Sequence, residues 1–228
     1  MLKENLDKIF SVIENGNNLG EPITLVGATK MVSAEIINQA ISYGLKVVAE
    51  NKVQEFNLKH GQITGAKEHF IGHLQTNKVK YLVGKVELIH SVDSIRLAEE
   101  INRQAVKKGV TQDILIEVNI GGELSKSGFD LSSAKKAVNE IANSFSNVRV
   151  KGLMAMLPHS EDESLLIDLT EKMRALYDDL KSTGLNFEYL SMGMSNDYKI
   201  AVKNGSNMIR LGRTIFGERN YGGNNGNI

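Results

Sequence analysis

Short apolar runs alternate with longer amphipathic stretches along most of the chain. Each run has the β-branched and aliphatic character of a buried strand. Between the runs, apolar residues recur at helical spacing, as in residues 3–15 and 134–142. Alternation of this kind predicts parallel strands joined by helical crossovers. The predicted strands lie within residues 23–30, 47–51, 69–72, 87–93, 113–120, 148–156, 189–193 and 207–217.

Eight such units within about 200 residues lie at the lower end of the range for a (β/α)8 barrel. We therefore predict an α/β fold, a single (β/α)8 TIM-type barrel with a leading N-terminal helix. An open, doubly wound sheet is the alternative, although no GxGxxG pattern follows the first strand. No linker rich in Pro, Gly or Ser divides the chain, so we expect one domain over residues 1–220 and a disordered tail over residues 221–228.

Small polar residues mark the expected beginnings of several helices. Ser33, Asp93 and Asp130 each stand just before a helical pattern and are predicted N-caps. Gly44 follows the second helical pattern and is expected to end it. A further helix is predicted between residues 69–72 and 87–93.

Charge and composition narrow the classes of partner. The 228 residues include 27 Lys plus Arg and 27 Asp plus Glu, so the formal net charge is zero and favours neither nucleic acid nor an acidic membrane surface. There is no cysteine, which excludes disulfides and thiolate chemistry. The N-terminus lacks the apolar core of a signal peptide, and no stretch approaches the roughly 20 apolar residues of a membrane span. We expect a cytoplasmic monomer that contacts neither nucleic acid nor membrane.

In a barrel of this class, the functional residues lie where the strands end. The first apolar run, ITLVGATK, ends on Lys30. A lysine at that point faces the place where such folds carry their chemistry, although lysines are also common at strand ends. The other predicted strand ends are rich in polar residues and glycine: Asn51, Gly72, His73, Lys126, and residues 154–156, 191–195 and 210–214.

Two of these strand ends have the residues of a phosphate site. In SMGMSND (191–197), glycine and serine stand in a turn that leads into a helix, where backbone N–H groups and hydroxyls can approach an anion. RLGRT (210–214) adds Gly212, Thr214 and two arginines after the last strand. Barrels that bind phosphorylated ligands often do so after strands seven and eight. Small residues also make ordinary tight turns, but the two stretches agree in position.

A lysine and a phosphate site at one barrel mouth indicate Schiff-base chemistry with a phosphorylated aldehyde. Two ligand classes fit, pyridoxal phosphate and a sugar phosphate in a Schiff-base aldolase. His69, His73 and His90 show no metal-ligand spacing, so we interpret them as structural or surface residues. Lys126 is expected to be an exposed loop lysine without a role.

Seven stretches along nearly the whole chain resemble the pyridoxal phosphate homeostasis protein family, single-domain relatives of the alanine racemase N-terminal barrel. The most specific are HFIGHLQTNK (69–78), SMGMSND and IRLGRTIFG (209–217). The chain departs from the family pattern at four places that include Ser33, where the family often has proline. The other matching stretches are ITLVGATK, AENKVQE (49–55), the SKSG loop (125–128) and VKGLMAM (150–156).

The resemblance implies a protein that holds pyridoxal 5'-phosphate as an internal aldimine on Lys30 and serves cofactor homeostasis, with apo-enzymes as possible recipients and without robust catalysis. It implies that Arg210 faces the pyridine nitrogen. The alternative is a pyridoxal phosphate-dependent amino-acid racemase. No catalytic residue and no metal ligand is expected. The expected cofactor-binding residues are Lys30, Asn51, Met192, Gly193, Ser195, Arg210, Gly212 and Thr214.

Overall fold

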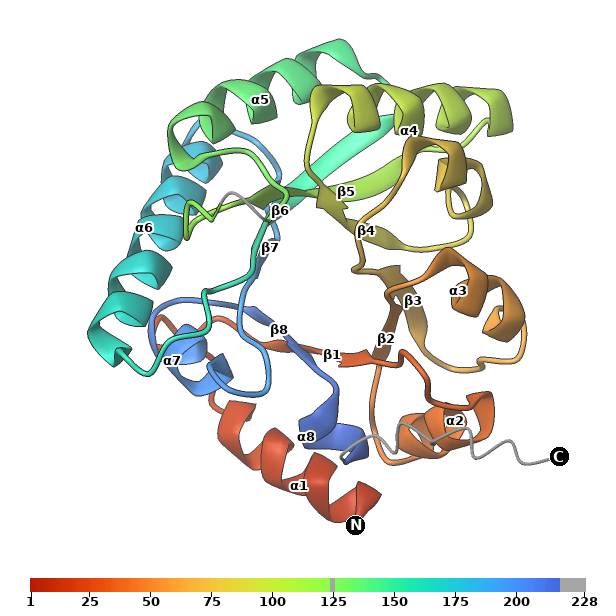
Figure 1. Cartoon of the computed structure of the whole chain (residues 1–228), viewed down its shortest axis with the longest axis vertical. Helices are drawn as coiled ribbons and strands as arrows, with labels where there is room; N and C mark the ends of the chain where they lie inside the picture. The colour runs from red at the N-terminus through yellow and green to blue at the C-terminus, as the bar shows by residue number, and fades with distance from the viewer. Residues whose placement is uncertain (124–125, 218–228) are drawn as a thin grey trace, which may run out of the picture.

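The computed structural model describes residues 1–123 and 126–217, and in it eight parallel strands close into a barrel (Figure 1). The strands follow one another around the barrel in sequence order, and β1 pairs with β8 to close it. The predicted barrel is therefore confirmed, and the open sheet is excluded. The strands are β1 (Thr24–Ala28), β2 (Val47–Glu50), β3 (Lys67–Phe70), β4 (Leu88–Val92), β5 (Gln112–Val118), β6 (Val148–Ala155), β7 (Tyr189–Ser191) and β8 (Met208–Leu211).

Helices surround the strands on the outside of the ring (Figure 1). The predicted leading helix packs against the last one, where Asn5 Nδ2 donates to the Ile215 carbonyl at 3.0 Å. Leu6 of α1 belongs to the same core cluster as Leu25 of β1 and Ile209 of β8, so this helix also packs near the pair of strands that closes the barrel. The predicted tail, residues 221–228, lies outside the described residues. The helices are α1 (Leu2–Ile13), α2 (Ala34–Ser42), α3 (Val53–Lys59), the 3₁₀ helix η1 (Thr76–Tyr81), α4 (Ile95–Lys108), α5 (Leu131–Ser144), α6 (Glu163–Ser182), α7 (Tyr198–Lys203) and α8 (Arg213–Phe216).

Two of the three predicted caps are confirmed and one is wrong. Ser33 Oγ accepts from the Ile36 amide at 3.4 Å, and Asp130 Oδ1 accepts from the Ser133 amide at 2.8 Å. The cap of α4 is Ser94, not Asp93. Asp93 Oδ2 instead pairs with His73 Nδ1 at 3.2 Å, and Asp93 Oδ1 accepts from the hydroxyl of the cap residue Ser94 at 3.1 Å.

The helix predicted after β3 is present as a short one. It is the 3₁₀ helix η1, in which Val79 is the buried residue. With one buried side chain in six residues, the segment lacks the apolar stripe that stabilises a longer helix. Gly44 adopts a φ of 107° just after α2, which confirms it as the residue that ends this helix.

The core consists of one layer between strands and helices and a smaller one inside the barrel. The interior layer contains Val26, Leu88, Leu115, Met154 and Met208, among others. Met154 places the methionine-rich stretch of β6 in this interior layer. Within residues 1–123 and 126–217, no helix is long and apolar enough to cross a membrane.

Candidate functional site

A cavity of about 730 Å³ opens at the carboxyl ends of the strands. Its wall includes residues that end or directly follow several strands, such as Ala28 on β1, Ile71 after β3 and Met156 after β6. This is the end of the barrel at which the sequence places its candidate chemistry. Five of the eight predicted site residues line it, namely Lys30, Asn51, Ser195, Arg210 and Gly212.

The other three predicted residues do not line the cavity. Met192 is fully buried in the core between sheet and helices. Gly193 has a φ of 100°, and a Cβ atom there would stand 2.9 Å from the Tyr198 Cα, so this position shapes the turn after β7. Thr214 is half-buried on α8 and does not line the cavity. Their contact with a ligand remains a prediction.

Lys30 lies in the loop between β1 and α2, two residues beyond the end of the strand. Its side chain is half-buried and forms part of the cavity wall. No ion pair within residues 1–123 and 126–217 involves it. Its amine is therefore available to a ligand in the cavity.

Arg210 reaches the cavity from inside the barrel and is only 5% exposed. One guanidinium nitrogen donates to both the carbonyl and the hydroxyl oxygen of Ser191, at 2.8 and 2.7 Å, and the other donates to the Ala155 carbonyl at 3.0 Å. Burial lowers the pKa of Arg210 to about 10, while Glu117 and Asp197 oppose the shift. The group thus remains a cation at neutral pH, held by uncharged acceptors.

A chain of buried polar side chains continues from Ser191 through the barrel interior. The Ser191 hydroxyl lies 3.4 Å from His90 Nδ1, and His90 Nε2 lies 3.0 Å from His69 Nδ1. Burial lowers the pKa of His69 to about 3 and that of His90 well below its ordinary value, so both rings are neutral. Neutral, buried rings agree with the interpretation of both histidines as structural residues. The sequence analysis did not, however, predict that they are linked to each other and to Ser191.

The signal for this chain lies in the alternation along the strands. Successive strand residues point to opposite faces, so positions two apart share a face. His90 follows inward-facing Leu88, Glu117 follows Leu115, and Arg210 follows Met208, each by two residues. These three positions therefore put polar side chains in the layer next to the cavity, above an apolar layer. Applying the period of two to each strand would have identified the layer.

Asn51 supplies the clearest sign that the cavity suits a polar ligand. Its Oδ1 atom is buried and has no hydrogen-bond partner among residues 1–123 and 126–217. A buried acceptor without a donor costs about 1–3 kcal/mol. Since Asn51 lines the cavity beside Lys30 and Arg210, a ligand that carries a hydrogen-bond donor would satisfy it.

The loops after β7 and β8 give the cavity an anion-binding character. The amides of Ser195 and Asn196 donate to no backbone acceptor within the described ranges, and Gly212 stands just before α8. The described wall carries four cationic side chains, from Lys30, Lys126, Arg210 and Arg213, against the two carboxylates of Glu161 and Asp197. This excess of cations and free donors fits a phosphate group.

The prediction for Lys126 is wrong in its placement. The side chain lines the cavity, is 26% exposed and pairs with Glu123 at 2.5 Å, so it is not an exposed loop lysine. Its loop folds back because the Phe129 amide donates to the Glu117 carbonyl and the Asn119 amide donates to Phe129. These two bonds hold the loop against the barrel mouth.

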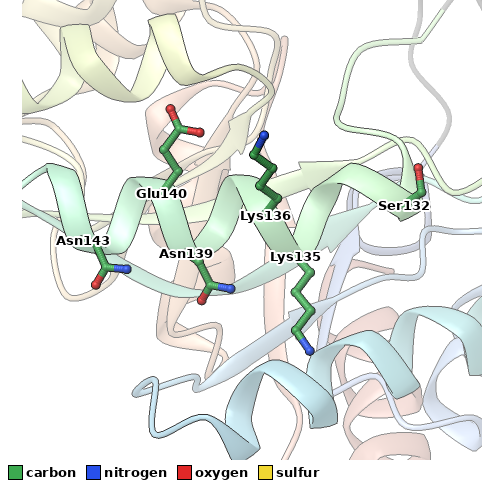
Figure 2. A pocket seen from close by; sticks show the side chains of 6 residues that line it. All are labelled: Ser132, Lys135, Lys136, Asn139, Glu140 and Asn143. Atoms are coloured by element: carbon green, nitrogen blue, oxygen red, sulfur yellow. The ribbon is translucent and has the colours of Figure 1, made fainter.

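A second hollow, of about 590 Å³, runs along the outer face of α5 (Figure 2). Figure 2 shows its six side chains projecting from one helix, and Lys135 pairs with Asp179 of α6 at 2.6 Å. It contains no buried titratable group, so the hollow has no sign of chemistry. Within the described part of the chain, no group of three or more His, Asp or Glu residues is placed to hold a metal ion.

Known proteins similar to this chain share both its sequence and its fold. The profile of the alanine racemase N-terminal domain matches residues 21–220. The pyridoxal phosphate homeostasis protein of Aquifex aeolicus strain VF5 is 41% identical over 223 residues, which cover 96% of this chain and 97% of that protein. The protein of the same name from Escherichia coli K12 is 34% identical over 221 residues, 94% of each chain.

Solved structures give the same picture. PipY of Synechococcus elongatus PCC7942 is 28% identical and covers 95% of this chain and 100% of its own, with TM-scores of 0.85 without PLP and 0.83 with PLP bound. Alanine racemase of Clostridium difficile 630 in complex with cycloserine has a TM-score of 0.80 at 13% identity and covers 96% of this chain and 60% of its own. At that identity, the likeness to the racemase shows the fold alone.

Proposed function

Because the chain belongs to the pyridoxal phosphate homeostasis protein family, whose barrel is that of the alanine racemase N-terminal domain, we propose that it binds pyridoxal 5'-phosphate covalently at Lys30 and serves cofactor homeostasis. The observation that carries this proposal is the composition of one cavity wall. It combines an unpaired lysine, a buried amide acceptor without a donor, and an excess of cations.

The residues of the wall fit the parts of this cofactor. When bound, pyridoxal phosphate supplies an aldehyde carbon that a neutral lysine amine attacks to form a Schiff base with loss of one water. Lys30 provides the amine. Ser195 and Gly212 would hold the phosphate, with Thr214 and Gly193 shaping the loops that carry them. Arg210 would face the pyridine ring nitrogen, and Asn51 Oδ1 would accept from a donor on the cofactor.

We further propose that holding and releasing the cofactor is the function, without robust catalysis. The homeostasis proteins that the chain matches carry the name of a cofactor rather than of a reaction. The released cofactor would pass to apo-enzymes that lack it. A Schiff-base aldolase acting on a sugar phosphate would use the same lysine and phosphate site, and the yellow colour of a bound pyridoxal group distinguishes the two.

Borohydride reduction followed by mass spectrometry tests the covalent site. Reduction of protein loaded with pyridoxal phosphate should attach one cofactor to the peptide that contains Lys30. Lys30→Ala should abolish the adduct while leaving thermal unfolding nearly unchanged, because the residue lies in a loop and contributes little to the core. Stoichiometric attachment to another lysine in the native protein would contradict the assignment.

A further inference from the structure

Three charged side chains outside the barrel, those of Glu50, Glu55 and Lys59, form hydrogen bonds to the loop that carries Lys30. Thr29, just before the lysine, is buried, and its hydroxyl donates to Glu50 Oε1 of β2 at 2.6 Å. Lys59, the last residue of α3, donates to the Thr29 carbonyl at 2.9 Å and to Glu50 Oε1 at 2.7 Å. Thr29, on the N-terminal side of Lys30, is thus held through both its side-chain hydroxyl and its backbone carbonyl.

The C-terminal side of Lys30 is fastened to the same helix. The Met31 amide donates to Glu55 Oε2 of α3 at 2.7 Å, and Lys59 lies 3.3 Å from that oxygen. Met31 has a φ of 60°, and it is the one residue other than glycine with a positive φ within residues 1–123 and 126–217. That conformation is unfavourable for a side chain that lacks a local polar group. The bond to Glu55 therefore holds a backbone turn that the sequence itself does not favour.

We propose that Lys59 is a positioning residue for Lys30: with Glu50 and Glu55, it fixes residues 29–31 so that the Lys30 side chain points into the cavity. This inference rests on the proposed function of Lys30. Lys59 does not line the cavity, and its ammonium is occupied by three acceptors, so it is not a competing site of attachment.

The charge arrangement makes Lys59 the connecting member of the group. Glu50 is 5% exposed, and its second carboxylate oxygen has no partner within the described residues. Lys59 is therefore the cation that compensates this buried carboxylate, and its side chain is itself only 15% exposed. Since both carboxylates bind the loop, losing the cation between them would loosen the backbone on both sides of Lys30.

The test measures whether Lys59 acts through Lys30, by a double-mutant cycle. Retention of pyridoxal phosphate is measured by equilibrium dialysis for the native protein, Lys59→Met, Lys30→Ala and the double variant. Lys59→Met should weaken retention about tenfold in the native background and leave it unchanged in the Lys30→Ala background. The same variant should also slow the attachment of the cofactor to Lys30, as followed by borohydride trapping.

Two controls make the outcome specific. Lys3→Met breaks an exposed ion pair of the same spacing, Lys3 with Asp7 on α1, and should change neither retention nor trapping. If Lys59→Met does not fold, Glu55→Ala replaces it in the test. Glu55 is more exposed than Lys59, so its loss should disturb the fold less, and in the native protein it accepts from the Met31 amide.

If Lys59→Met lowers retention equally in the native and Lys30→Ala backgrounds, Lys59 merely supports the barrel. If it lowers retention in neither, the position of the Lys30 loop does not depend on Lys59. Either result overturns the inference while leaving Lys30 as the attachment site. If Lys30→Ala alone leaves retention and trapping unchanged, the proposed function fails, and the inference fails with it.

Discussion

Ser195 shows how a single hydroxyl contributes to the site. It lines the cavity in the turn between β7 and α7, next to an amide that has no backbone acceptor in the described ranges. It is half-buried, so a bond to an anionic oxygen there is partly shielded from water. Bonds to charged groups are worth about 1.5–3 kcal/mol, more than those between neutral groups.

Ser195→Ala should therefore weaken retention of pyridoxal phosphate by about 1–3 kcal/mol, measured by dialysis at fixed ionic strength. Pyridoxal, which lacks the phosphate, should bind the native protein far more weakly and should be insensitive to the substitution. Equal affinity of the native protein for the two compounds would contradict the anion site.

Glu117 is a second residue whose environment has a measurable consequence. It lies in the polar layer of the barrel interior and is 4% exposed. Burial raises its pKa from 4.5 to about 7, the Asp93 carboxylate adds to the shift, and Arg210 and His73 oppose it. The folded protein therefore binds this proton more tightly than the unfolded chain does. The resulting stabilisation is complete below pH 4.5 and is lost as the pH rises through about 7.

Glu117→Gln should remove this pH dependence. Relative to the native protein, the variant should gain up to about 3 kcal/mol of unfolding free energy between about pH 5 and about pH 8. Urea unfolding of both proteins at these two pH values measures this difference in unfolding free energy. His69 and His90 contribute with the opposite sign, since their lowered pKa values cause loss of stability as the pH falls below 6.5, but both proteins retain them. Parallel stability curves for the two proteins would contradict the raised pKa.

At the scale of elements, the backbone that follows β3 packs closely against the backbone that follows β2. Gly72 follows β3, and a Cβ atom at this position would lie 2.0 Å from the Asn51 carbonyl oxygen. The Gly72 carbonyl in turn accepts from the buried Ser91 hydroxyl at 2.6 Å. The glycine of the HFIG stretch is thus required by the close approach of the backbone that presents Asn51 to the cavity.

Gly72→Ala should displace Asn51 and lower both stability, by about 1–3 kcal/mol, and retention of pyridoxal phosphate. Gly121→Ala is the matched control, because its Cβ would meet only flexible or ordinary contacts, the nearest being the Glu123 side chain at 3.2 Å. Thermal unfolding and dialysis of the two variants measure the difference. Unchanged retention in Gly72→Ala would show that the Asn51 position does not matter to the ligand.

The elements were largely predictable from the sequence because each strand carries a short apolar run and each crossover a helical stripe. The closed order of the strands also followed, since eight alternating units favour a barrel. The period of two points to a shared polar layer, but the individual contacts from His69 to Arg210 did not follow, because residues far apart in the sequence meet only after closure. Likewise, no spacing in the sequence reveals that Asp93 pairs with His73 from another strand end.

The candidate site was predictable as a set of strand ends but not as a set of contacts. Lys30, Asn51 and Arg210 share one wall because the carboxyl ends of parallel strands meet at one mouth. Lys126 was misplaced, because nothing local in its loop shows that the chain returns to the barrel. Lys59 was missed because its role is carried by bonds to Thr29 and Glu50, which no spacing reveals.

For the whole molecule, the arrangement of groups around the mouth bears on catalysis. Inverting the α-carbon of an amino acid requires one group to remove a proton from one face and another to deliver a proton to the opposite face. Lys30 is the candidate for one face. Within the described residues, no tyrosine lines the cavity, and Lys126 is paired with Glu123. Of the other titratable groups on the wall, His159 and Glu161 are exposed, and Asp197 Oδ1 accepts from the Met194 amide at 2.5 Å.

The position of Arg210 acts in the same direction. An arginine at the pyridine nitrogen, the place the family resemblance implies, disfavours protonation of that nitrogen and weakens the ring as an electron acceptor. Burial lowers the pKa of Arg210 to about 10, which is still well above neutral, so the guanidinium keeps its charge beside the neutral His90. Both features favour a protein that holds the cofactor over one that inverts amino acids.

We therefore expect alanine to racemise no faster with the loaded protein than with an equal concentration of free pyridoxal phosphate. The measurement follows loss of the α-proton signal in heavy water together with chiral analysis of the product. Slow exchange without inversion agrees with a single competent lysine, because the proton returns to the face from which it left. Lys30→Ala is the control and should reduce even this exchange to the rate of the free cofactor. Rapid racemisation that disappears in Lys30→Ala would establish an opposing base and replace the carrier by a racemase.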